Sequence, residues 1–129
     1  ALRARELRRG RQAIAAAGVT PAPFYRPPFG VMRAGHAAEL RALGITPVLG
    51  DVFPRDPERP GTEAIVRRVL EVLRAGSILI LHEGSGWGDF DRTQTIAAAD
   101  RILTECATRG LAAVSVGELL AARDAQSRA

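Results

Sequence analysis

The stretch Phe24–Gly30 constrains the fold of this chain more than any other, because it contains two adjacent prolines, Pro27 and Pro28. Each proline fixes its φ angle near about −65° and has no N–H to donate to a β-ladder. Gly30 permits a left-handed exit from the turn. The pattern predicts a short strand that ends in a rigid loop. Such a loop would hold Arg26 and one backbone amide in fixed positions.

The chain has 129 residues, which suits one domain, and 47% of them are hydrophobic, as in globular proteins. The net charge of +4 comes with 18 basic residues, all of them arginine, and could suit a nucleic acid. However, the arginines alternate with apolar and acidic residues along helical stretches, which is typical of solvated helix faces. We therefore expect no nucleic-acid partner.

Cys106 is the single cysteine, so no internal disulfide is expected. No run approaches the roughly 18 apolar residues of a transmembrane helix, and no signal-peptide pattern opens the chain. We therefore expect no membrane segment. These residues do not identify the compartment.

Helical and strand patterns alternate along the chain. The unbroken apolar run Ser77–Leu81 predicts a strand buried on both faces. Strands are also predicted at 24–25, 45–49 and 111–114, and helices at 2–17, 32–43, 62–75, 92–109 and 116–123, with Ile96, Ala99, Leu103 and Ala107 on one face of the fourth helix. Short strands joined by crossover helices imply an α/β fold with a parallel sheet or a barrel arc.

Three polar residues fall at the carboxyl ends of successive predicted strands: Arg26, Asp51 and His82. Ligand sites gather at such ends, so we expect these three side chains at one rim. Asp51 would accept a hydrogen bond from His82 and favour the protonated imidazole, which could then donate a proton. The alternative is a structural Asp–His or Asp–Arg pair that caps the sheet. Asp56, by contrast, is predicted to lie in a solvated loop.

Three segments carry a family resemblance. The runs Arg26–Gly30, Leu49–Pro54 and Ile80–Gly84 resemble, in order and spacing, the third, fourth and fifth motifs of the polysaccharide deacetylases. This is the NodB-homology group, carbohydrate esterase family 4. The resemblance implies a partial distorted (β/α) barrel of the NodB type, with parallel strands alternating with helices. It also implies a metal-dependent carbohydrate deacetylase, a hydrolase that removes N-acetyl or O-acetyl groups from an amino-sugar polymer or oligomer.

The resemblance implies a role for each matching catalytic residue. Arg26 would hold the catalytic base, an aspartate, by a charge-assisted hydrogen bond. The backbone N–H of Phe29 would donate to the oxyanion of the tetrahedral intermediate. His82 would protonate the leaving amine, and Asp51 would tune His82.

Substrate-binding roles follow for three further residues. Pro28 belongs to the third motif, and Ile80 would line the pocket for the acetyl methyl group. Trp87, in the glycine-rich loop after His82, could stack on a sugar ring. The alternative for Trp87 is a loop anchor packed against the final helix.

The family's first two motifs are absent from this sequence. They supply the base and the ligands of a divalent metal, for which zinc is expected, so no metal ligand is predicted in this chain. His36 and His82 are the only histidines, and His36 is predicted to lie on the surface near the start of a helix.

We therefore expect residues 1–129 to be the C-terminal portion of one deacetylase domain, without its first strands and inactive alone. Missing strands would leave an exposed barrel edge that favours self-association or pairing. Two alternatives remain: a non-catalytic pseudoenzyme that binds a carbohydrate or a partner, and a generic α/β domain with a structural Arg–Asp–His set.

Overall fold

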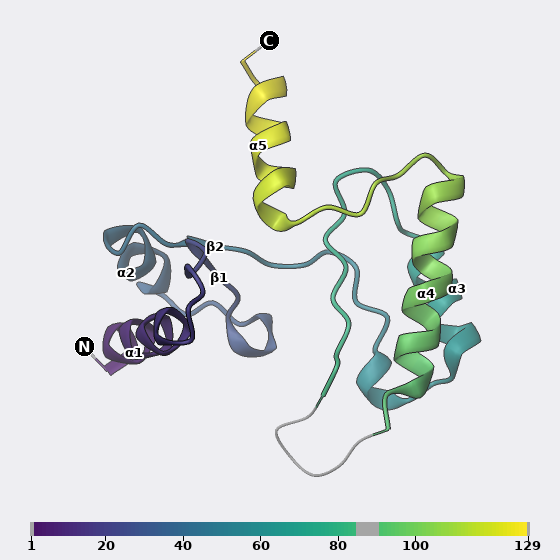
Figure 1. The fold of residues 1–129 in the computed structure, drawn as a ribbon, viewed down its shortest axis with the longest axis horizontal. Helices are drawn as coiled ribbons and strands as arrows, with labels where there is room; N and C mark the ends of the chain where they lie inside the picture. The colour runs from purple at the N-terminus through teal and green to yellow at the C-terminus, as the bar shows by residue number, and fades with distance from the viewer. Residues whose placement is uncertain (1, 85–90, 129) are drawn as a thin grey trace. The chain divides into compact units, whose positions relative to one another are not determined.

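The computed structural model describes residues 2–84 and 91–128 (Figure 1). The chain divides into two compact units, Ala1–Leu49 and Gly50–Ala129, which we call unit 1 and unit 2. In the described residues, no helix combines the length and the apolar character that crossing a membrane requires.

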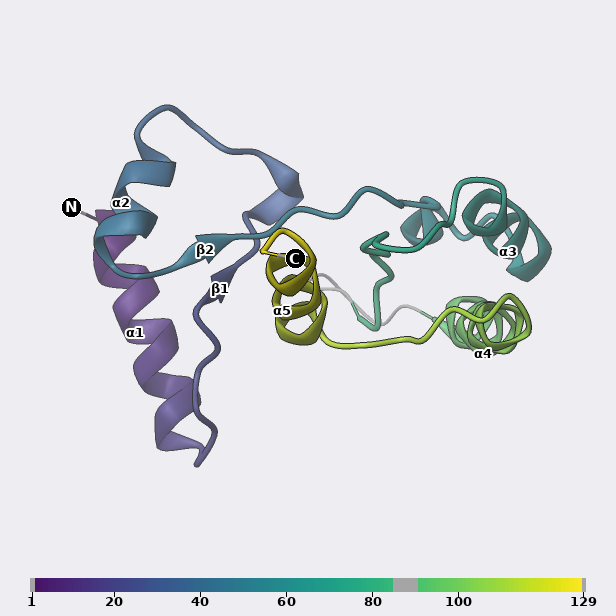
Figure 2. The same ribbon diagram turned by 90° about the horizontal axis from the view of Figure 1, so that it is seen from above.

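Unit 1 is built on a pair of short parallel strands. Phe24 lies opposite Thr46 in the register, and the N–H of Thr46 donates to the carbonyl of Pro23 at 2.8 Å. The elements are α1 (Leu2–Ala16), β1 (Phe24–Tyr25), η1 (Pro28–Gly30), α2 (His36–Ala42) and β2 (Thr46–Pro47). Figure 2 shows the helices α1 and α2 beside this strand pair. The predicted parallel pairing of the first two strands is confirmed.

Unit 2 is dominated by helices. Two of them, α3 and α4, lie side by side in both views (Figures 1 and 2). A parallel bridge joins Val52 to Leu79. The elements are η2 (Asp56–Glu58), α3 (Thr62–Leu70), α4 (Thr93–Thr108) and α5 (Val116–Gln126). The structure therefore keeps the predicted order of helices.

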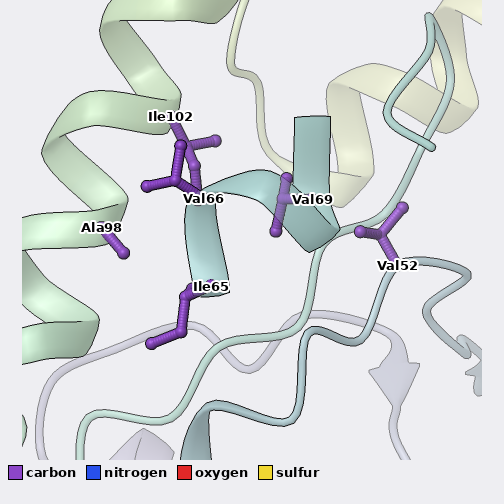
Figure 3. Packing of buried hydrophobic residues seen from close by; sticks show 6 residues of the cluster. All are labelled: Val52, Ile65, Val66, Val69, Ala98 and Ile102. Atoms are coloured by element: carbon purple, nitrogen blue, oxygen red, sulfur yellow. The ribbon is translucent and has the colours of Figure 1, made fainter. Parts of the chain in front are cut away.

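The hydrophobic core of unit 2 lies between α3, α4 and the Val52 segment (Figure 3). It consists of six buried residues: Val52, Ile65, Val66, Val69, Ala98 and Ile102. The apolar face predicted for α4 is not the buried one, since Ile96 and Leu103 are 69% and 53% exposed. The buried face of α4 carries Ala98 and Ile102 instead. This face was not predicted because alanine is small and contributes little to an apolar pattern.

The prediction of a fully buried strand over Ser77–Leu81 is wrong. Its residues are half-buried, and only Leu79 forms a bridge. An apolar run indicates burial but does not supply strand partners, and Val52 is its one bridge partner among the described residues. The predicted strand at 111–114 is also not formed, and α2 begins later than expected because Gly35 turns left-handed just before it, at φ 78°.

Candidate functional site

The site in unit 2 is centred on His82, which a buried carboxylate holds by two bonds. Asp56 Oδ2 accepts from the backbone N–H of His82 at 2.9 Å, and Asp56 Oδ1 lies 3.0 Å from the ring Nδ1. The Asp56 side chain is fully buried, whereas the His82 side chain is 37% exposed. Because an ionised carboxylate can only accept, Nδ1 carries the proton in this pair. Nε2 is then the ring nitrogen that can exchange a proton with a substrate.

The predicted contact between Asp51 and His82 is wrong. Asp51 Oδ1 accepts from the N–H of Ile78 at 2.7 Å, and its Oδ2 lies 3.2 Å from the guanidinium of Arg74 and 3.5 Å from the Ser77 hydroxyl. Asp51 therefore ties its loop to the segment that leads to His82. A direct catalytic role for Asp51 stays a prediction.

Asp56 is the candidate site residue that the sequence analysis missed. Instead of lying in a solvated loop, it is fully buried at the start of η2. Its only signal in the sequence is an aspartate before a proline, which marks a turn and not a site. The loop after Asp51 turns so that Asp56 reaches His82. The residue pattern of the loop does not specify this turn.

Bonds from both helices hold the loops around this pair. Arg68 on α3 donates to the carbonyl of Pro54 at 2.9 Å, and Arg92 donates to the carbonyl of Gly84 at 3.3 Å. On α4, the hydroxyl of buried Thr95 lies 3.3 Å from Asp56 Oδ2. The ring of Phe53 meets the His82 imidazole edge to face, with centroids 5.7 Å apart.

An ion pair joins the two helices that frame the site. Arg101 on α4 donates to both carboxylate oxygens of Glu63 on α3. Hydrogen bonding and charge from Arg101 lower the pKa of Glu63, and the same contact raises the pKa of Arg101. At the start of α4, hydrogen bonds from Thr93 lower the pKa of Asp91.

The third-motif residues lie in unit 1. Phe29 has a left-handed backbone at φ 56°, and its side chain is fully exposed. The N–H groups of Gly30 and Val31 donate to the carbonyls of Pro27 and Pro28, so these turn bonds do not use the N–H of Phe29. A strained residue in a proline-held turn is a feature of functional sites.

The predicted common rim of Arg26, Asp51 and His82 spans both units and stays a prediction. Arg26 is exposed in unit 1, and Ile80 is half-buried in unit 2. Trp87 lies outside the described residues. The structure therefore brings together His82 and Asp56, and it separates Asp51 from His82.

Unit 1 contains a pocket of about 420 Å³ between α1 and the strand pair. It is lined mainly by apolar residues, and none of the predicted catalytic residues lines it. His36 forms part of the wall and is only 6% exposed, so its prediction as a surface histidine is wrong. Its ring packs edge to face on Tyr25, with centroids 5.5 Å apart.

The described residues do not fit a catalytic metal. In residues 2–84 and 91–128, no group of three or more His, Cys, Asp or Glu side chains is placed to hold a metal ion. A catalytic zinc takes three ligands from protein. The metal expected for the intact family domain stays a prediction.

Comparison with curated proteins gives two informative relatives. The chain is 37% identical over 99 residues to a peptidoglycan-N-acetylglucosamine deacetylase of Bacillus cereus, covering 75% of this chain and 45% of that protein. It is 35% identical over 91 residues to a chitooligosaccharide deacetylase of Sinorhizobium fredii, covering 66% of this chain and 42% of that protein. The chain thus spans less than half the length of these relatives. No family model matches the sequence.

Solved structures agree with the sequence comparison. A family 4 carbohydrate esterase from Streptomyces lividans, solved with acetate, matches with a TM-score of 0.75 and 32% identity, over 88% of this chain and 55% of that chain. A family 4 pseudoenzyme from Bacillus anthracis matches with a TM-score of 0.79 over 91% of this chain and 39% of that chain. At 21% identity, the pseudoenzyme shows the fold alone.

These similarities define the class of the protein: its homologues are carbohydrate deacetylases, and its fold is the NodB type. The similarities support a NodB-type polysaccharide deacetylase domain of carbohydrate esterase family 4. The expected fold, a partial distorted barrel of parallel strands and helices, is confirmed.

Proposed function

We propose that this chain carries the proton-donating side of a metal-dependent deacetylase that removes N-acetyl or O-acetyl groups from an amino-sugar polymer or oligomer. The observation that supports this most directly is the His82–Asp56 pair, which combines a buried acceptor with a partly exposed imidazole. General acids of this kind contribute about 10²- to 10⁴-fold to enzymatic rates.

The proposed step uses groups of this chain. Asp56 holds the ring through Nδ1–H, and in the doubly protonated imidazolium form Nε2–H gives its proton to the leaving amine nitrogen as the C–N bond breaks, which leaves the neutral Nδ1–H ring. The N–H of Phe29 donates to the oxyanion, and Arg26 orients the base. Pro28, Ile80 and Trp87 line the acetyl and sugar subsites in this proposal.

We also propose that residues 1–129 alone are inactive. The described residues contain no metal-binding group, and an aspartate base has no counterpart among the motifs of this chain. The chain spans 45% of its Bacillus cereus relative, so the remaining parts of the site would come from other polypeptide. An N-acetylated saccharide is the proposed substrate, as the name of that relative suggests.

Acetate release tests this function. Two proteins are compared with N-acetylchitooligosaccharide and zinc: the 129-residue chain, and the product of the gene with any sequence encoded before Ala1. We expect acetate from the longer protein only, and a loss of about 100-fold or more with His82→Ala. Glu83→Gln is the control, because Glu83 is the exposed residue next to His82. Its acetate release should stay near that of wild type. Saccharide binding without acetate release would instead identify a non-catalytic binding module.

A further inference from the structure

We infer that Thr95 is a positioning residue for His82 and acts through Asp56. This inference rests on the proposed function of His82, but its structural basis lies entirely in unit 2. Three groups converge on the Asp56 carboxylate: the N–H and the ring Nδ1 of His82, and the hydroxyl of Thr95. Nothing in the sequence motifs assigns a role to Thr95.

The Thr95–Asp56 hydrogen bond can fix the carboxylate because both groups are buried. The Asp56 side chain is fully buried, and Thr95 is only 4% exposed, so water does not compete for the bond. A buried carboxylate needs hydrogen-bond donors at its oxygens, because a buried acceptor without one loses the bonds that water would have given it. Oδ2 receives the backbone N–H of His82 and the Thr95 hydroxyl, which leaves Oδ1 for the ring.

Two threonines further along α4 make a different contact, and Thr93 at its start bonds to the nearby Asp91 carboxylate. The hydroxyls of Thr104 and Thr108 donate to carbonyls four residues earlier in the same helix, at 3.0 and 3.1 Å. This is the local bond that a helical threonine ordinarily forms. Thr95 is directed instead to a carboxylate 39 residues away in sequence.

The consequence is a fixed ring and a fixed tautomer. With Thr95 and the His82 N–H both on Oδ2, the carboxylate plane cannot rotate freely, and Oδ1 stays opposite Nδ1. The proton is therefore kept on Nδ1 and the reactive nitrogen is Nε2. Without the hydroxyl, the carboxylate can rotate and the neutral ring can exchange between its two tautomers.

Nitrogen NMR on the full chain tests this directly. With ¹⁵N-histidine label and His82→Gln for assignment, we expect wild-type His82 to show the Nδ1–H tautomer when neutral. Thr95→Val, which removes the hydroxyl but keeps the shape, should give a mixture of tautomers. Thr95→Ser should restore the wild-type spectrum, and Thr104→Val should not change it.

The outcomes separate the inference from the proposed function. An unchanged His82 tautomer in folded Thr95→Val would overturn the inference. If the valine variant does not fold, Thr95→Ser decides, since a mixed-tautomer spectrum there would overturn it. The tautomer needs no substrate, so a failure of the acetate assay leaves this test intact. In an active longer protein, Thr95→Val should lower kcat about 10- to 100-fold with little change in KM.

Discussion

The carboxylate of Asp56 accepts both hydrogen bonds that His82 directs to it, one from the backbone and one from the ring. The backbone bond, at 2.9 Å, fixes where the residue sits, and the ring bond, at 3.0 Å, fixes how the imidazole is turned. A single aspartate therefore sets both the position and the tautomer of the proposed acid.

The first prediction separates the two aspartates. Asp56→Asn keeps one acceptor oxygen and replaces the other with an N–H₂ donor, so one of the two N–H groups of His82 loses its acceptor and the ring orientation or tautomer is no longer fixed. In the longer protein we expect deacetylation to fall about 100-fold, measured as acetate release. Asp51→Asn keeps an oxygen for the N–H of Ile78 and should retain most activity. Equal losses in the two variants would contradict the geometry described above.

The contrast between these aspartates shows what a sequence can predict. His82 could be found because it follows an apolar run, and the end of such a run is a local feature. The partner of His82 could not be found in the same way. The loop after Asp51 turns so that Asp56 reaches His82, whereas Asp51 bonds to the N–H of Ile78. Only the three-dimensional path of that loop distinguishes them.

The same limit applies to the predicted strands and helix faces. The end of α1 before Gly18 and the start of α5 after Ser115 follow local chemistry, and both lie close to the bounds that the sequence predicts. Strand formation over Ser77–Leu81 depends on the strands available to pair with it. The sequence of this segment does not show which strands those are. Local signals therefore gave the order of elements, and non-local contacts decided the pairing.

The second prediction concerns a close approach beside Asp51. A Cβ atom at Gly50 would lie 2.5 Å from the Ile80 side chain and 2.9 Å from the carbonyl oxygen of Ile78. The side chain could move, but the carbonyl belongs to backbone that also bonds to the Asp51 loop. We expect Gly50→Ala to destabilise the chain by about 1–3 kcal/mol in urea unfolding. Gly84→Ala is the matched control, because no atom of the described residues lies within 4 Å of a Cβ placed there.

The third prediction concerns pH and the Glu63–Arg101 pair. Arg101 lowers the pKa of Glu63 in the folded chain below its ordinary value of 4.5. A group with a lowered folded pKa stabilises the fold above its unfolded pKa, and this stabilisation is lost as the pH falls through the folded value. Wild-type urea midpoints should therefore drop between pH 6 and about pH 3 by more than those of Glu63→Gln.

A control removes a carboxylate that does not join two helices. Glu71 lies 4.0 Å from Arg67 of the same segment, so Glu71→Gln changes the net charge in the same way. Its acid dependence should stay close to that of wild type. An acid dependence of Glu63→Gln that matches wild type would show that the bridge between α3 and α4 does not contribute. Added salt should weaken the effect, because the pair is exposed.

The last prediction tests which face of α4 is buried, using two isoleucines of one helix. Ile102 is 2% exposed and packs in the core, whereas Ile96 is 69% exposed. Ile102→Ala leaves a cavity between the helices and should cost about 2–5 kcal/mol of unfolding free energy. Ile96→Ala removes little buried area and improves helix propensity, so we expect a change within about 0.5 kcal/mol. Urea unfolding followed by circular dichroism measures both, and a larger loss for Ile96→Ala would mean that α4 buries the apolar face its sequence pattern predicts.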